Sequence, residues 1–225
     1  MKKLITGVIS ALAALTPEMV QAQGTIYLSN LGQSFSDNNP VASDSWLAVG
    51  FVTGTNVGGY LLDSFELGIA NATGNPSGFT VMLYNQSTNP LAVLPGNSLA
   101  TLNGSDSPST AGIYTYTPAI NLFLSPNTLY FAVLAAGTTV ANGAYAWNYT
   151  STGSYNPNGG WSGVGVTLTS SDGSTWFRLG SSPNYDYSEI AITATSIPEP
   201  SFLWLLFLGS GVLFYVRKRK RQSGF

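Results

Sequence analysis

Apolar and polar residues alternate in short runs through most of the chain, over residues 24–196. A period of two places successive side chains on opposite faces of an extended strand, and this region lacks the apolar spacing of an amphipathic helix. Runs rich in aromatic and β-branched residues therefore predict strands. The predicted strands are 25–28, 46–53, 60–69, 79–84, 98–102, 112–117, 129–135, 144–150, 165–168, 175–179 and 189–195.

Clusters of Asn, Pro, Gly, Ser and Asp separate these runs and predict turns. The predicted turns are 38–40, 74–76, 89–90, 125–127, 156–160, 171–173 and 182–184. Many short strands at this spacing predict an all-β body, arranged as a two-sheet antiparallel β-sandwich or jelly roll. No boundary or repeat interrupts the pattern, so we expect one domain over residues 23–196.

The N-terminus breaks this pattern. Lys2 and Lys3 precede an apolar stretch over residues 4–15, and the segment ends in the small-residue pattern Val20-Gln21-Ala22. This order is typical of a secretory signal peptide, here 1–22, with cleavage between Ala22 and Gln23. The alternative is a core helix or an anchor, but the apolar run is too short to span a bilayer. Export implies signal peptidase and the secretion machinery as partners.

The C-terminus carries a second apolar stretch. Residues 201–216 hold no charge and form a helix of about 24 Å if helical, against about 30 Å for the hydrocarbon core of a bilayer. Snorkelling basic side chains and local thinning can close that gap. A basic run follows directly, Arg217, Lys218, Arg219, Lys220 and Arg221. By the positive-inside rule this run is a cytoplasmic stop, so 201–216 is predicted to be a single transmembrane helix with the body outside. The alternative, a nucleic-acid or nuclear-localisation run, ignores the adjoining apolar stretch.

Pro198-Glu199-Pro200 stands immediately before that stretch. The two prolines lock φ and remove backbone donors, so the segment is expected to be extended. Taken alone it could be a rigid spacer. The order of Pro-Glu-Pro, short apolar helix, basic cluster and chain end resembles the PEP-CTERM sorting signal of Gram-negative bacteria. That resemblance implies processing by an exosortase, a transient inner-membrane intermediate, and delivery to the cell surface or to an exopolysaccharide (biofilm) matrix.

The body carries a looser resemblance. The successive strand patterns at 46–54, 60–67 and 79–84 are similar to those of the choice-of-anchor β-sandwich domains, in particular the R type. This resemblance implies an exported surface module and brings no catalytic residue with it.

Composition excludes several chemistries. The chain has no Cys and no His, which removes thiol nucleophiles, disulfides, Cys/His zinc sites and Ser-His-Asp triads. Residues 23–196 hold eight acidic residues against one basic residue, Arg178. A body this acidic repels a phosphate backbone, so nucleic acid is excluded as a partner. We expect no cofactor and no metal, and Asp172-Gly173 and 37–39 are better explained as turns than as calcium loops.

Carboxylates are the remaining candidates for catalysis. A glycosidase needs two of them facing one cleft. The close pairs are Asp63 with Glu66 and Asp186 with Glu189, and residues three apart in a regular strand point to opposite faces. A carboxylate-dependent hydrolase therefore remains the least favoured function.

Tyr145, Trp147 and Tyr149 share one face of a predicted strand. Such a row is either the core face of a sandwich strand or an exposed platform that stacks on sugar rings, and the core is the favoured interpretation. Overall we expect an exported, non-enzymatic surface or matrix protein with no catalytic residue. A carbohydrate-binding module for extracellular polysaccharide is the alternative.

Overall fold

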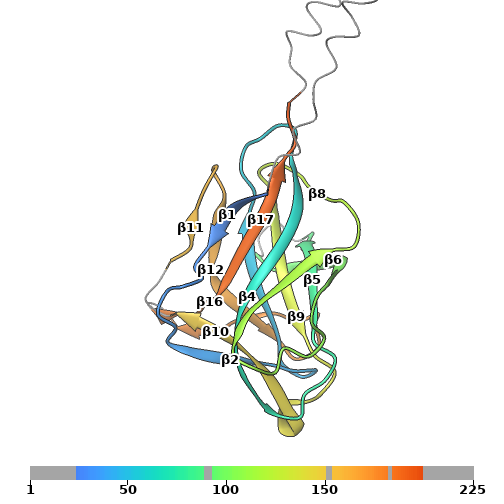
Figure 1. The fold of residues 1–225 in the computed structure, drawn as a ribbon, viewed down its shortest axis with the longest axis vertical. Helices are drawn as coiled ribbons and strands as arrows, with labels where there is room; N and C mark the ends of the chain where they lie inside the picture. The colour runs from blue at the N-terminus through green and yellow to red at the C-terminus, as the bar shows by residue number, and fades with distance from the viewer. Residues whose placement is uncertain (1–23, 89–92, 151–153, 182–183, 200–225) are drawn as a thin grey trace, which may run out of the picture.

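The computed structural model describes residues 24–88, 93–150, 154–181 and 184–199. Within these ranges the chain is almost entirely strands and turns, and all strand pairs are antiparallel (Figure 1). The helical content of the described ranges is one 3-10 turn, η1 (Val140–Asn142). The prediction of an all-β antiparallel body is therefore confirmed.

The strands follow the predicted runs closely, with several short additions. In chain order they are β1 (Thr25–Ser29), β2 (Asp37–Val41), β3 (Trp46–Val52), β4 (Tyr60–Gly74), β5 (Thr80–Gln86), β6 (Pro95–Asn103), β7 (Gly112–Pro118), β8 (Leu122–Leu124), β9 (Leu129–Ala135), β10 (Gly143–Thr150), β11 (Asn156–Pro157), β12 (Ser162–Ser170), β13 (Phe177–Arg178), β14 (Gly180–Ser181), β15 (Asn184–Tyr185), β16 (Tyr187–Ser188) and β17 (Ile190–Ser196).

Most strands belong to one continuous sheet with the order β11-β1-β17-β4-β7-β6-β5-β9-β3-β12-β13. Strand β10 pairs with β4, β2 and β16, and β8 pairs with the start of β4. Strands β6 and β7 are joined by two residue pairs. The sheet is therefore continuous at this bend, and neither strand is an edge strand there. The sheet curls into a half-barrel (Figure 1), and β14 and β15 form a separate two-stranded ribbon.

The main core fills the inside of the curl. It takes alternate side chains from strands far apart in the sheet order, among them Phe51 of β3, Leu83 of β5, Phe65 of β4, Trp147 of β10 and Ile192 of β17. A smaller cluster packs on the other face of β3, β5 and β9, around Met82, Phe131 and Trp176. Strands β3 and β9 are therefore covered on both faces, which explains their nearly continuous apolar sequences.

Strand β4 keeps its core face in register by means of a bulge. Its pairing with β17 shifts between Thr193, opposite Ser64, and Ala194, opposite Leu62, which leaves Asp63 as an extra residue. The large apolar side chains of the core consequently pass from Leu62 to Phe65, with the small Ser64 buried between them. A strict period of two, as assumed from the sequence, fails at this point.

The predicted turn at 38–40 is wrong, because these residues lie in β2. Pro40 stands opposite Ala146 of β10, and among the described strands β2 pairs with β10 alone. An edge strand tolerates proline because one side of its backbone forms no ladder. The predicted turn at 156–160 is shorter than expected for a similar reason: Asn156 and Pro157 pair with β1.

Several predicted features lie outside the described residues. They are the signal peptide at 1–22 with its cleavage between Ala22 and Gln23, the turn at 89–90, the first two residues of the turn at 182–184, Pro200, the transmembrane helix at 201–216, and the basic run at 217–221. Among the residues that are described, no helix is long and apolar enough to cross a bilayer.

Candidate functional site

The candidate site is the junction where the body passes into the Pro-Glu-Pro segment. Strand β17 ends at Ser196, opposite Tyr60 of β4, and one more backbone bond continues the ladder: the Ile197 N–H donates to the carbonyl of Gly59 (3.0 Å). Pro198 has no N–H and cannot extend the ladder. The segment therefore leaves the sheet at a point set by the sequence.

A tight turn over residues 56–59 holds this exit. The Gly59 N–H donates to the carbonyl of Asn56 (2.8 Å), and Gly59 has a φ of 72°, in the left-handed region. The Asn56 amide Nδ2 donates to the carbonyls of Gly59 (2.6 Å) and Ile197 (3.0 Å). A side chain at Gly58 would collide with the Ile197 carbonyl, so the close approach of turn and segment requires glycine there.

The same turn reaches the glutamate of the predicted sorting motif. The Val57 N–H donates to Oε1 of Glu199 at 3.4 Å, an exposed and long hydrogen bond. Together with the Ile197 contacts, it lays Ile197, Pro198 and Glu199 against the turn. The first two residues of Pro198-Glu199-Pro200 are thus placed on the surface of the body.

The N-terminal end of the body lies beside this junction. Thr25 of β1 pairs with Ala194 of β17, and the backbone of Gly24 approaches the side chains of Asp63 and Thr193. Figure 1 shows β1 beginning and β17 ending at the same end of the molecule. The two predicted membrane-directed segments, 1–22 and 201–216, are therefore attached at one end.

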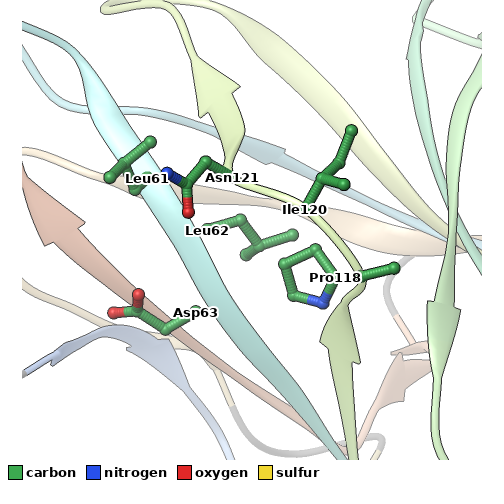
Figure 2. A pocket seen from close by; sticks show the side chains of 7 residues that line it. Leu61, Leu62, Asp63, Pro118, Ile120 and Asn121 are labelled. Atoms are coloured by element: carbon green, nitrogen blue, oxygen red, sulfur yellow. The ribbon is translucent and has the colours of Figure 1, made fainter.

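A shallow hollow of about 280 Å³ lies next to the junction, along the first residues of β4. The connection from β7 to β8 forms its other wall (Figure 2). Its lining residues are Leu61, Leu62, Asp63, Pro118, Ala119, Ile120 and Asn121. The Asp63 carboxylate is the one charged group in this lining, and it accepts a hydrogen bond from Thr195 Oγ1 (2.8 Å). The hollow lacks a set of polar groups converging on a ligand.

The aromatic row on β10 belongs to the core. Tyr145 and Trp147 are fully buried, whereas Tyr149 is half-buried. The Trp147 Nε1–H donates to the carbonyl of Glu189 (2.8 Å), and the Tyr145 hydroxyl reaches the carbonyl of Pro76 (3.1 Å). The alternative of an exposed platform on Tyr145 and Trp147 is therefore wrong, because neither ring has a free face for a sugar.

Neither of the two carboxylate pairs forms the facing acid pair that a glycosidase needs, because at least one carboxylate of each pair hydrogen-bonds to another residue. Glu189 is 6% exposed and accepts a hydrogen bond from the Asn148 amide (3.1 Å), while Asp186 accepts one from the Asn39 amide (3.2 Å). Burial raises the pKa of the Glu189 carboxyl, and the Asn148 hydrogen bond partly opposes this. The bulge at Asp63 removes the argument that Asp63 and Glu66 must point to opposite faces, but Asp63 is engaged by Thr195.

The raised pKa of Glu189 predicts how the stability of the protein depends on pH. The folded state then binds a proton more tightly than the unfolded state, so the contribution of this carboxyl to stability falls as pH rises from the unfolded pKa through the folded one. Glu189→Gln removes the titration and keeps an amide-to-amide contact with Asn148. We expect the variant to be at least as stable as the wild type at pH 7.

Urea unfolding of both proteins at pH 4 and pH 7 measures this effect. All other titrating groups are shared and cancel in the difference between the two proteins. The advantage of Glu189→Gln should shrink at pH 4. If the stability advantage of Glu189→Gln grew on acidification, the pKa of the Glu189 carboxyl could not be raised by burial.

The Asp172 turn is structural. Its carboxylate accepts hydrogen bonds from the Ser174 N–H (2.8 Å), the Thr175 N–H (2.8 Å) and the Ser170 hydroxyl (2.9 Å), which lower its pKa, the backbone donors most. All three donors meet one oxygen, Oδ1, and the Thr175 hydroxyl donates to the other, Oδ2, at 3.4 Å. Across the described ranges, no group of three or more acidic side chains is placed to hold a metal ion.

Sequence reasoning did not single out turn 56–59. Its Asn-x-Gly-Gly pattern is a turn signal, but the partner of that turn is Ile197, far away in the chain. No local pattern encodes such a contact.

No protein-family model matches this chain, and no curated protein matches it either. The interpretation of its C-terminal segment therefore depends on the residues of the segment and on the junction described above.

Proposed function

We propose that this chain is an exported, non-enzymatic protein of the cell surface or extracellular matrix, sorted through its C-terminal segment by an exosortase. The observation that carries the proposal is the order of Pro198-Glu199-Pro200, the uncharged stretch 201–216 and the basic run 217–221. The junction supports it, because the last strand ends one residue before the motif and leaves Pro198 and Glu199 exposed on the surface of the body.

The position of the two ends also supports this function. Thr25 and Ala194 are paired neighbours, so the two membrane-directed segments leave the body side by side. While the signal peptide is still attached, both can therefore reach one membrane. For the body itself we propose a surface module of the choice-of-anchor, sandwich type.

Replacing Pro198-Glu199-Pro200 by Ala-Ala-Ala tests the proposal in a Gram-negative host that encodes an exosortase. Export should continue, since the signal peptide and the apolar stretch remain. The protein should accumulate in the inner membrane with its C-terminal segment attached. Fractionation, followed by the intact mass of the protein in each fraction, reports both the location and the two processing sites.

Replacing Gln222, Ser223 and Gly224 by alanine is the matched control, because it changes as many residues of the same tail beyond the basic run. That variant should reach the surface like the wild type. Deleting 217–221 should have a separate effect: without its cytoplasmic stop the protein should slip through the membrane instead of stalling for processing. Normal surface release of the Ala-Ala-Ala variant would refute the sorting function and leave an ordinary single-span anchor.

A further inference from the structure

Two large apolar side chains are exposed at the junction. Val57, in the turn that holds Ile197, is 75% exposed, and Phe123 of β8 is 50% exposed. The ring of Phe123 lies over Gly59, 2.6 Å from the place where a Cβ would stand. Both side chains thus belong to the small surface around the exit of the C-terminal segment. Ile120, 74% exposed, lines the hollow together with Leu61, the residue that pairs with Phe123.

The length of the following chain limits how far this surface can lie from a membrane. Glu199 is hydrogen-bonded to Val57, and the uncharged stretch begins at Ser201, two residues later. Two extended residues reach about 7 Å. The Glu199 side chain and its 3.4 Å hydrogen bond to Val57 add to this reach. If 201–216 spans the bilayer, as the proposed function requires, Val57 lies roughly 15 Å or less from the start of the span, close to the headgroup region.

The short span strengthens this constraint. A helix over 201–216 reaches about 24 Å against about 30 Å of hydrocarbon, so the chain on either side is drawn toward the membrane. On the cytoplasmic side the basic side chains can snorkel. On the outer side the residues drawn in are the Pro-Glu-Pro segment and the turn that binds it.

Charge identifies the kind of contact. The acidic groups at the junction are Glu199 and Asp63, and the one basic residue of the body, Arg178, belongs to β13 at the far end of the strand order. Attraction to anionic headgroups is therefore absent, and the available driving force is burial of apolar surface at the acyl boundary.

From these observations we propose that Val57 and Phe123 form a membrane-contacting tip, which seats the body on the outer surface of the bilayer while the C-terminal segment is attached. This inference rests on the proposed function. The tip holds the Pro-Glu-Pro segment at the depth of the interface, where a membrane-embedded enzyme can reach it. Its partner is the lipid bilayer, in zwitterionic and anionic membranes alike.

Site-specific fluorescence in lipid nanodiscs tests the tip with the full chain. The chain has no cysteine, so each single-Cys variant carries one environment-sensitive label. Val57→Cys is the main probe and Phe123→Cys the second. Ile113→Cys is the matched control, because Ile113 is 62% exposed on β7 but stands opposite Gly68, well along β4. Gly209→Cys reports whether the apolar stretch has entered the bilayer.

Labels at 57 and 123 should be blue-shifted, several-fold less quenched by aqueous iodide than the label at 113, and quenched by a lipid-borne quencher. The result should be the same in phosphatidylcholine discs and in discs with added phosphatidylglycerol. Iodide quenching at 57 equal to that at 113, with the label at 209 protected, would overturn the tip and leave the membrane span intact.

Two other outcomes also count against the tip. An iodide-accessible label at 209 would contradict the proposed function itself, and the tip with it. Protection at 57 that does not respond to the lipid-borne quencher would assign this surface to a second copy of the chain. Because Val57 is mostly exposed, its replacement leaves the core untouched and keeps the test independent of folding.

Discussion

Replacing Asn30 by alanine is expected to lower the free energy of unfolding by about 3–5 kcal/mol, a large part of the stability of an ordinary domain. Asn30 is fully buried between the end of β1 and the start of β17. Its Oδ1 accepts the Ile190 N–H (2.8 Å), and its Nδ2 donates to the carbonyls of Tyr187 (3.2 Å) and Ser188 (3.1 Å).

The side chain of Asn30 thus takes the place of backbone partners where β16 passes into β17. Alanine would leave the Ile190 N–H and the Tyr187 carbonyl without these partners inside the protein, and each orphaned group costs about 1–3 kcal/mol. The Ser188 carbonyl would keep a weaker contact with the Tyr155 hydroxyl (3.4 Å). The larger part of the loss therefore arises from unpaired polar groups, since the volume removed is small.

Urea unfolding of residues 23–199 measures this loss. Asn38→Ala is the matched control, because Asn38 is an exposed asparagine on the edge strand β2. It should change stability by less than about 0.5 kcal/mol. Equal losses from the two variants would show that Asn30 acts only through its local backbone preference.

Replacing Trp147 by alanine is expected to cost about 3–5 kcal/mol, by a different mechanism. The Trp147 ring is fully buried in the main core, and its removal leaves a cavity that a curled sheet closes poorly. The Glu189 carbonyl, which accepts the Trp147 indole N–H, also accepts the Gly68 N–H (3.1 Å). Because that carbonyl stays paired, the cost measures packing.

Thermal or urea unfolding again provides the measurement, and the same strand provides the control. By strand alternation Tyr149 lies on the same face of β10 as Trp147, but it is only half-buried. Tyr149→Ala should therefore lose less than half the stability that Trp147→Ala loses. Trp147→Phe should fall between the two, since it keeps part of the ring. A Trp147→Ala protein as stable as the wild type would reopen the surface-platform alternative that the burial of Trp147 has closed.

The strand pattern could be read from the sequence because it depends on local alternation. Strands β3, β9 and β10 lie where the apolar runs predict them. Strand β2 was missed because its sequence, Asp-Asn-Asn-Pro-Val, has the composition of a turn. Its conformation is set by pairing with β10, and an edge position is the one place in a sheet where that sequence fits.

At the candidate junction, too, some features can be predicted from the sequence and others depend on the tertiary structure. Residue order alone identifies Pro198-Glu199-Pro200, the uncharged stretch and the basic run, because each depends on composition within a few residues. The hydrogen bond from Asn56 to Ile197 requires β17 to end beside the start of β4, which follows from the pairing of these two strands, distant in the sequence.

By itself, then, the sequence determined that this protein is all-β, that it lacks Cys and His chemistry, and that its two ends differ in kind from its body. Tertiary structure alone decided that Tyr145 and Trp147 face the core, that Glu189 is buried against Asn148, and that the exposed Val57 and Phe123 lie beside the exit of the C-terminal segment. The physical reason is that alternation tells which side chains share a face of a strand, whereas only the pairing and curling of the strands decide which face is covered.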